Sequence, residues 1–418
     1  METSARAAKR TASFAAAGIG FLLLVAMDAP VWSQQPAQQR PRRVTKTQSQ
    51  TSADPSPPAR PAPSPSPSEG VDEVDEGDVV RVETQLVSVP AVVTNATGRP
   101  VSGLRAENFL LFENGQQQRI TNFATTEAPF EIALLLDTSG STRADVDLIR
   151  QAADAFIGAL RPGDRVAIVA FNTTRQGRNV AAKVEVLAPL TDDRKLLRNA
   201  TANLGSSNGT PFYDALKRIA DEVFREPPRE EMRGRRAIVA LTDGVDSTSE
   251  ADFQTVRSKL SRAGVASYFI QVNTEDFVED RLLRDCQDDG RLTLSAKQLE
   301  RYRQVFYPRA RPEDFLDFCE MGQFEKMQIS RDLYNLARRE MDELAKSSGG
   351  KNFLAATLQD ARAAFAGVAT EIGTQYSLGY YPTNKARDGK FRAIRVEVQG
   401  APARSQVRAR EGYYAPKS

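Results

Sequence analysis

The middle of the chain, residues 128–373, alternates two hydrophobic patterns. Continuous apolar runs, typical of strands buried on both faces of a parallel sheet, alternate with segments whose apolar residues recur at helical spacing. The main apolar runs are EIALLLD at 131–137, DRVAIVAFN at 164–172, RRAIVALTD at 235–243 and VASYFIQVN at 265–273. KNFLAA at 351–356 predicts a further strand, and KVEVLAP at 183–189 predicts an edge strand. This alternation predicts a doubly wound α/β domain with a mostly parallel sheet.

The two flanking segments, residues 79–127 and 374–418, alternate apolar and polar residues in short stretches instead. VETQLVSVPAVVTNATGRPVSGL at 82–104 predicts a strand, a glycine-centred turn and a return strand, and ENG at 113–115 indicates a hairpin turn. Neither flank has enough strands to be stable alone. We therefore expect the two flanks to combine into one small β-sandwich, with the α/β domain inserted between them.

The first part of the chain has the pattern of an export signal followed by a spacer. In residues 1–33, basic residues precede the apolar run FAAAGIGFLLLVA at 14–26, which is too short to span a bilayer comfortably and is typical of a signal peptide. Cleavage after Ser33 leaves no membrane span, and an uncleaved anchor is the alternative. Residues 34–78 are rich in Pro, Gln and Ser, so they predict a disordered linker. We expect a periplasmic, cell-surface or secreted protein.

Composition excludes several classes of function. The 418 residues carry a net charge of only +2, and no basic stripe with interleaved aromatics indicates nucleic-acid binding. The RGRR run at 233–236 is interpreted as a solvated lead-in to the strand that follows. The chain contains no histidine, which excludes Ser-His-Asp and Cys-His catalysis, and with only two cysteines a zinc site of the usual kind is disfavoured. Any metal must therefore be a hard cation held by oxygen.

Residues 274–330 interrupt the alternation of strands and helices, and we interpret them as an insertion. A connection of this length is typical of a functional or docking element, although a structural loop is the alternative. The insertion contains Cys286 and Cys319, the only cysteines of the chain. In an oxidising compartment they predict one disulfide, and two free buried thiols are the alternative.

Oxygen-bearing side chains follow the apolar runs at the points where ligands bind in open α/β sheets. Asp137, Ser139 and Ser141 follow the first run, Asp243 ends the third, and Thr210 in SSNGTPFYDAL precedes a predicted helix. Two carboxylates and three hydroxyls form a hard-oxygen donor set that suits Mg²⁺ and also accepts Mn²⁺ or Ca²⁺. The sequence therefore predicts a divalent-cation site at this edge of the sheet.

Each of these residues also has a plain structural interpretation. Asp137 or one of the serines could cap the helix that begins near residue 144. Thr210 and Pro211 make a good N-cap and first helical residue. Asp243 and Gly244 are a common turn pair. The occurrence of all three elements in order, each at a strand end or helix start, favours the metal site.

The quoted loops resemble a known family. DTSGS, NGTPFYDAL and LTDG are similar to the three loops of the metal-ion-dependent adhesion site in von Willebrand factor A domains. The flanks, GRPVSGLRAENFLLFENGQQQRITNF and QYSLGYYP with VRAREGYYAP, resemble the related proteins of Acidobacteria, so the resemblance covers about residues 80–415 and implies a bacterial protein. Two departures are the NG that precedes Thr210, where the family more often has GG, and the long 274–330 insertion.

The resemblance implies specific roles for the candidate residues. Ser139 and Ser141 would coordinate the cation directly, and Asp137, Thr210 and Asp243 would bind it directly or through water. An open coordination position would then accept a carboxylate from a partner protein's Asp or Glu. We therefore expect an exported adhesion or protein-binding module and not an enzyme. A structural or assembly protein of the cell envelope with a non-binding site is the alternative, and a metal-dependent hydrolase is disfavoured because no histidine is available as a base.

Overall fold

The computed structural model describes residues 86–139, 146–176, 179–226, 235–275, 278, 294–315 and 321–417. All of them belong to one compact unit, residues 79–418. The predicted signal peptide and linker lie outside the described residues, as do Ser141, Cys286 and Cys319. The export, the linker, the disulfide and the role of Ser141 therefore stay predictions.

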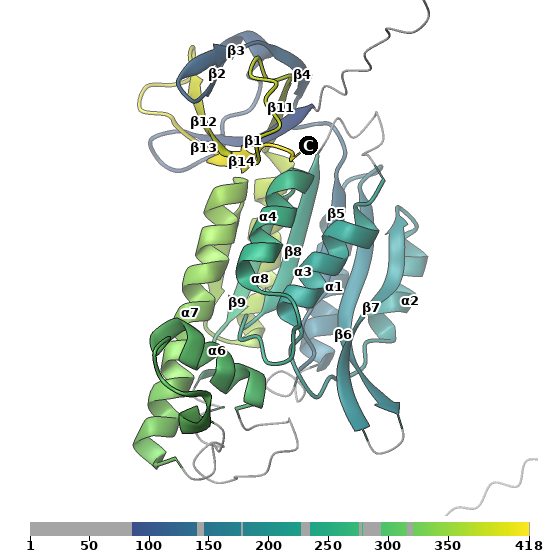
Figure 1. Cartoon of the computed structure of the whole chain (residues 1–418). Helices are drawn as coiled ribbons and strands as arrows, with labels where there is room; N and C mark the ends of the chain where they lie inside the picture. The colour runs from purple at the N-terminus through teal and green to yellow at the C-terminus, as the bar shows by residue number, and fades with distance from the viewer. Residues whose placement is uncertain are drawn as a thin grey trace, which may run out of the picture. The chain divides into compact units, whose positions relative to one another are not determined.

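A six-stranded sheet forms the centre of the molecule, in the order β10-β9-β8-β5-β6-β7 (Figure 1). Its strands are parallel except for β7, which runs antiparallel to β6 at one edge. This confirms the predicted fold class and the predicted edge strand. The strand bounds are β5 Glu131–Leu136, β6 Arg165–Gln176, β7 Asn179–Thr191, β8 Arg236–Thr242, β9 Ala266–Val272 and β10 Lys351–Ala355.

The continuous apolar runs are explained by two hydrophobic cores, one on each face of the sheet. Successive side chains of a strand point to opposite faces. In β5, Ile132, Leu134 and Leu136 pack on one face, and Ala133 and Leu135 pack on the other. Each fully buried leucine or isoleucine stabilises the fold by about 1.5–3 kcal/mol, which explains why β5 is apolar at every position from Ile132 to Leu136.

Helices cover both faces. One face is covered by α1 (Val146–Ala159), α2 (Arg194–Ala202) and α8 (Ala361–Gly373). The other is covered by α3 (Phe212–Arg218), which continues as a π-helical turn at Ile219–Val223, by α4 (Phe253–Ala263) and by α7 (Gln323–Ser348).

The described part of the insertion is helical and has a small core of its own. Helix α6 (Ala296–Phe306) and a 3-10 turn at Pro312–Phe315 precede α7, which begins inside the predicted insertion and not near residue 330 as the sequence indicates. Leu299 and Tyr302 of α6 pack against Ile329 and Leu333 of α7. The insertion therefore extends the layer of helices beyond the sheet.

Two four-stranded antiparallel sheets form the β-domain, in the orders β13-β1-β11-β4 and β14-β12-β2-β3. Each sheet pairs strands from both flanks of the chain, as the sequence predicts. Asn114 and Gly115 have φ angles of 48° and 83° in the β2–β3 turn, the left-handed conformation that such a tight hairpin requires. The strand bounds are β1 Val87–Thr94, β2 Phe109–Glu113, β3 Gln116–Gln118, β4 Ile120–Ala124, β11 Tyr376–Tyr380, β12 Phe391–Val398, β13 Gln406–Ala409 and β14 Gly412–Tyr414.

The predicted return strand after β1 is wrong. Beyond the turn, the chain makes only an isolated bridge between Thr94 and Pro100. The neighbours of β1 are instead β11 and β13 from the C-terminal flank. A strand paired on both sides by distant segments has no free edge for a local hairpin.

The interpretation of the RGRR run as a solvated lead-in is also wrong for its described residues. Arg235 is 1% exposed and Arg236 is 7% exposed. Arg236 pairs with the buried carboxylate of Glu131 at 2.9 Å. Arg235 donates to backbone carbonyls where the chain passes between the β-domain and the α/β domain.

Candidate metal centre

Two aspartates lie side by side where neighbouring strands end. Strands β5 and β8 are parallel, with Leu136 opposite Leu241, so the next residues along each strand reach the same edge of the sheet. The backbone N–H of Asp137 donates to the Leu241 carbonyl at 3.0 Å, and Asp243 follows two residues later. The two aspartates are 0% and 3% exposed. The strand register therefore brings two predicted ligands together in a buried setting.

The Asp137 carboxylate is held by short contacts on both oxygens. Its Oδ1 accepts from the Ser139 N–H at 2.9 Å, and its Oδ2 accepts from the Thr242 hydroxyl at 2.6 Å. The carbonyl of Thr138 accepts from the Ser207 N–H at 2.9 Å, which ties this loop to the one that leads to Thr210.

Thr210 lies at the start of α3, but it is not the cap of that helix. The helix begins at Phe212 with Pro211 at the N-cap, so the interpretation of Thr210 as a helix cap is wrong. Thr210 instead exchanges two hydrogen bonds with Ser247. Its N–H donates to the Ser247 hydroxyl at 2.8 Å, and its carbonyl accepts from the Ser247 N–H at 3.0 Å. These bonds connect the second predicted loop to the third.

Asp243 opens a turn and also faces two polar residues that the sequence did not single out. Its Oδ1 accepts from the Val245 N–H at 3.0 Å, and Gly244 has a φ of 77°, so the interpretation as an Asp-Gly turn is confirmed. Its Oδ2 accepts from the Thr274 hydroxyl at 2.7 Å, which lies 2.7 Å from the Tyr334 hydroxyl. The carboxylate is thus oriented from two sides.

The sequence contains a signal that could have identified Thr274 as a residue of the site, but none that could have identified Tyr334. Thr274 follows the apolar run of β9 at the same edge of the sheet, which is the signal that identified the other loops. Tyr334 lies on α7, sixty residues further on, and no local pattern connects it to the site.

Burial and the second carboxylate dominate the electrostatics of the centre. Burial, together with the charge of Asp243, raises the pKa of Asp137 from 3.8 to about 7. Burial also raises the pKa of the Tyr334 phenol, and Asp243 adds to this effect. Two buried carboxylates at close range favour a proton or a cation between them. Carboxylate and hydroxyl oxygens are ligands that Mg²⁺ prefers, so the chemistry of the donor set fits a hard divalent cation.

The described residues contain no cluster of three or more Asp, Glu, His or Cys side chains suited to a metal. Asp137 and Asp243 supply only two carboxylates, so hydroxyls and water would have to complete any coordination sphere. One or two carboxylates completed by water and other oxygen ligands are common in Mg²⁺ sites.

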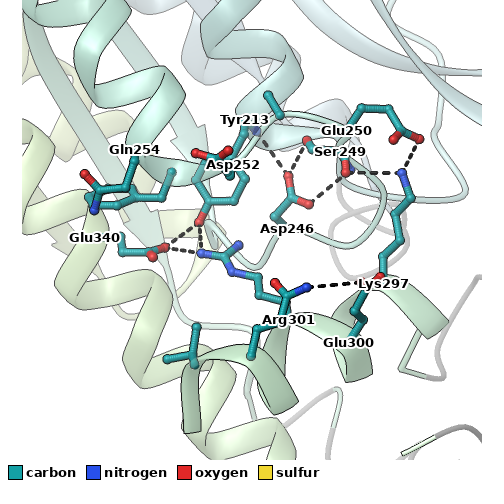
Figure 2. A pocket seen from close by; sticks show the side chains of 14 residues that line it. Tyr213, Asp246, Ser249, Glu250, Asp252, Gln254, Lys297, Glu300, Arg301 and Glu340 are labelled. Carbon is teal, nitrogen blue, oxygen red and sulfur yellow. Dashed lines mark hydrogen bonds and ion pairs between the residues drawn. The ribbon is translucent and has the colours of Figure 1, made fainter. Parts of the chain in front are cut away.

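A cavity of about 440 Å³ lies next to these loops and is lined by residues of α3, α4, α6 and α7 (Figure 2). On its wall the Tyr213 hydroxyl donates to the Glu340 carboxylate, and Arg301 of α6 donates to both groups. The Arg301 guanidinium carbon lies 4.5 Å from the centre of the Tyr213 ring. Asp246 accepts from the Tyr213 N–H at 3.1 Å. The insertion helix is thereby attached to the first turn of α3, close to Thr210.

Residues 132–245, which include every predicted metal ligand, match the family described as von Willebrand factor type A domain. This match assigns residues 132–245 to the von Willebrand factor type A domains. Such domains are often protein-interaction modules. None of the curated proteins matches the chain closely enough to count as a relative. Among the residues that the structure describes, no helix has the length and apolarity needed to cross a bilayer.

Solved structures similar to this chain include a protein from the mussel byssus, a von Willebrand factor type A protein and BatB. Proximal thread matrix protein 1 from the mussel byssus is 14% identical with a TM-score of 0.37, over 68% of this chain and 49% of that one. The domain from Catenulispora acidiphila is 11% identical with a TM-score of 0.37, over 80% and 75%. BatB from Bacteroides thetaiotaomicron is 14% identical with a TM-score of 0.35, over 58% and 97%. The match covers about half the length of the mussel protein.

The electrostatics of Asp137 predict how the metal-free protein responds to pH. Because the folded-state pKa is raised above 3.8, the folded state binds more protons than the unfolded state between about pH 4 and 7. The free energy of unfolding in EDTA should therefore fall as pH rises through this window and level off above it. Urea unfolding at pH 6 and pH 8 measures the difference. Greater stability at pH 8 than at pH 6 would contradict the assignment.

Proposed function

We propose that Asp137, Ser139, Ser141, Thr210 and Asp243 hold a divalent cation, with Mg²⁺ as the first choice and Mn²⁺ or Ca²⁺ as alternatives. The observation that carries the proposal is the pair of buried aspartates on adjacent parallel strands, of which Asp137 has a pKa raised to about 7 by burial and by Asp243. A cation would neutralise both carboxylates in this setting. When bound, it would supply an electrophilic position open to a further oxygen ligand.

We infer that this open position accepts a carboxylate from an Asp or Glu of a partner protein, so that the domain acts as a metal-dependent adhesion module. The chain's own residues would orient the cation and surround it with buried groups that exclude water, which strengthens a charge-assisted contact. A hydrolase needs a base that is free to take a proton, and the chain has no histidine for this role. The aspartates of the centre would both be engaged by the cation.

The proposal includes export of a bacterial protein, which rests on the sequence of residues 1–33 and on the linker at 34–78. Such a linker would hold the folded domains away from a membrane or wall to which the chain was attached. N-terminal sequencing of the protein recovered from outside the cytoplasm, with Gln34 as the first residue, would support cleavage of the signal.

Capture of envelope proteins tests the proposed function. Immobilised protein should retain partners in Mg²⁺ and lose them in EDTA, because the contact passes through the cation. Asp137→Ala protein should retain none in either buffer, whereas Asp164→Asn should behave like the unsubstituted chain. Asp164 is a matched control, since it is also buried and its carboxylate accepts from the Phe130 N–H at 2.8 Å, at the opposite end of β5.

Chemical amidation of the carboxyl groups of the envelope proteins should also abolish capture, since it removes the group that the cation would bind. The same partners in Mg²⁺, in EDTA and with Asp137→Ala would contradict adhesion through this centre. They would favour a structural envelope protein with a non-binding site.

A further inference from the structure

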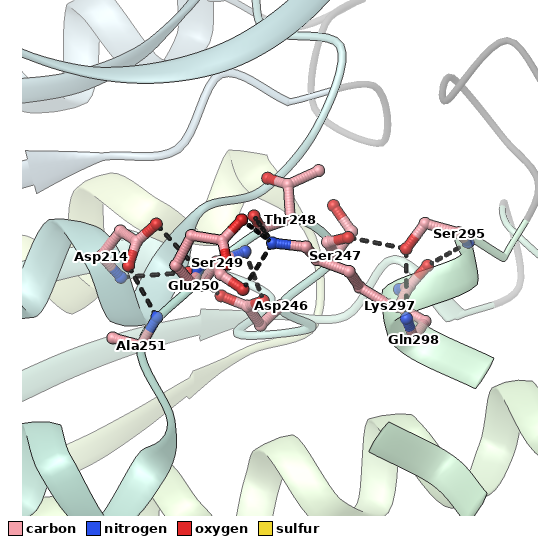
Figure 3. Close-up of polar contacts among 10 residues, drawn as sticks. All are labelled: Asp214, Asp246, Ser247, Thr248, Ser249, Glu250, Ala251, Ser295, Lys297 and Gln298. Carbon is pink, nitrogen blue, oxygen red and sulfur yellow. Dashed lines mark hydrogen bonds and ion pairs between the residues drawn. The ribbon is translucent and has the colours of Figure 1, made fainter. Parts of the chain in front are cut away.

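The first turn of α6, from the insertion, is hydrogen-bonded to the loop that follows Asp243 (Figure 3). Ser295 caps α6, since its hydroxyl accepts from the Gln298 N–H at 3.2 Å. The same hydroxyl donates to the Ser247 carbonyl at 2.6 Å. The residue that starts the insertion helix is thus also bonded to the loop of the candidate metal centre.

Lys297 makes a second set of contacts with this loop. Its ammonium donates to the carbonyls of Thr248 at 3.3 Å and Ser249 at 3.2 Å, and it pairs with the Glu250 carboxylate. An ammonium has three N–H donors, and these contacts account for all of them. Three acceptors on consecutive residues are therefore held by one side chain of the insertion.

The loop in turn is bonded to the start of α3. The Asp214 N–H donates to the Ser249 hydroxyl at 3.0 Å, and the Asp214 carboxylate accepts from the N–H groups of Glu250 and Ala251 at 3.0 and 2.9 Å. Ser247, which Ser295 contacts, exchanges two hydrogen bonds with Thr210. A continuous series of contacts therefore runs from α6 through Ser247 to Thr210.

We propose that Ser295 and Lys297 are positioning residues for the metal centre: by holding the 247–250 loop, they fix the place of Thr210 relative to Asp243. This inference rests on the proposed metal site and assigns a role to the insertion. Residues that orient the ligands of a metal typically change its affinity by about 10–100-fold when they are removed. Neither residue is hydrogen-bonded to the predicted ligands that the structure describes, so the effect passes through the 247–250 loop.

The test compares Mg²⁺ affinity and local opening in a double variant, Ser295→Ala with Lys297→Met. Isothermal titration with Mg²⁺ alone should show affinity at least about tenfold weaker than in the unsubstituted protein. In metal-free protein, amide hydrogen exchange of residues 207–213 and 244–250 should become faster, while exchange in β5 and β8 stays the same. Ser295→Thr with Lys297→Arg keeps a hydroxyl and a cation and should restore most of the affinity.

Lys259→Met is the matched control. Lys259 also pairs with a carboxylate, that of Asp221 at 2.6 Å, but it lies on α4 away from these loops. It should leave both Mg²⁺ affinity and exchange at residues 207–213 unchanged. If the double variant does not fold, Lys297→Met alone is measured in the same way, with a smaller loss expected.

Failure of the proposed metal site and failure of the positioning role would give different results. If the unsubstituted protein binds none of Mg²⁺, Mn²⁺ and Ca²⁺, the proposed function is overturned and, with it, this inference. Mg²⁺ binding that is equally tight in the unsubstituted protein and in the variant with Ser295→Ala and Lys297→Met would overturn the positioning role alone. Faster exchange spread over the whole domain would also contradict it, since that result indicates general loss of stability.

Discussion

Replacement of Asp137 by asparagine is expected to stabilise the metal-free protein and to abolish its stabilisation by Mg²⁺. At pH 8 the folded protein must keep a buried carboxylate charged next to Asp243, at a pKa of about 7. A shift of this size corresponds to a few kcal/mol, so removal of the charge should raise the free energy of unfolding in EDTA by about 1–3 kcal/mol. The amide oxygen of the introduced asparagine can still accept from the Ser139 N–H.

The same substitution should remove the metal effect because an amide is a weaker ligand than a carboxylate. For the unsubstituted protein, Mg²⁺ at about a hundred times its dissociation constant should add about 2.7 kcal/mol. Urea unfolding of both proteins, with EDTA or with Mg²⁺, gives all four values. Asp164→Asn is the control and should keep the full Mg²⁺ effect. A variant that is less stable in EDTA, yet gains as much from Mg²⁺ as the original, would contradict the electrostatic account.

Replacement of Arg235 by methionine is expected to lower the free energy of unfolding by about 3–5 kcal/mol, because each buried polar group left without its partner costs about 1–3 kcal/mol. Arg235 donates to the carbonyls of Ala128, Ile372 and Gln375. Its guanidinium carbon also lies 4.1 Å from the centre of the Phe130 ring. Methionine has similar volume but no donor.

Because Arg235 contacts the connections between the two domains, its replacement should destabilise those connections first. Ala128 and Gln375 lie on the two segments that connect the β-domain to the α/β domain, so their opening should let proteases cut both segments before the sheet unfolds. Arg257→Met is the control, since Arg257 forms a partly exposed pair with Glu343 at 2.9 Å and such pairs contribute about 0–1 kcal/mol. A loss below about 1 kcal/mol for Arg235→Met would show that these carbonyls find other partners.

The central sheet could be predicted because strands that are buried on both faces have continuous apolar runs in the sequence. Ile132 to Leu136 are apolar without interruption since alternate residues enter two different cores. The β-domain was also predictable from its alternating pattern and from the shortage of strands in each flank. The missing return strand after β1 was not, because the partners of β1 come from the distant strands β11 and β13. Local pattern does not record long-range pairing.

The residues of the candidate site also fall into two groups, those that the sequence pattern predicted and those that it did not. Asp137, Ser139, Thr210 and Asp243 were visible because each stands at the end of an apolar run or the start of a helix. Tyr334, Ser295 and Lys297 were not, because they act across the fold from helices whose own patterns are explained by packing. Arg235 was misinterpreted since a basic run before a strand is usually solvated, whereas here it supplies donors to buried carbonyls of two other segments.

The central claim is that the loops after β5 and β8 and before α3 hold one divalent cation. A crystal structure of the protein grown with Mn²⁺, with anomalous data collected at the manganese edge, tests it most directly. The account predicts one strong anomalous peak within coordination distance of the Asp137 and Asp243 carboxylates or their bound waters, with the Ser139 and Thr210 hydroxyls facing it. A fully folded domain with no peak there, or with its only peak elsewhere, would contradict the account.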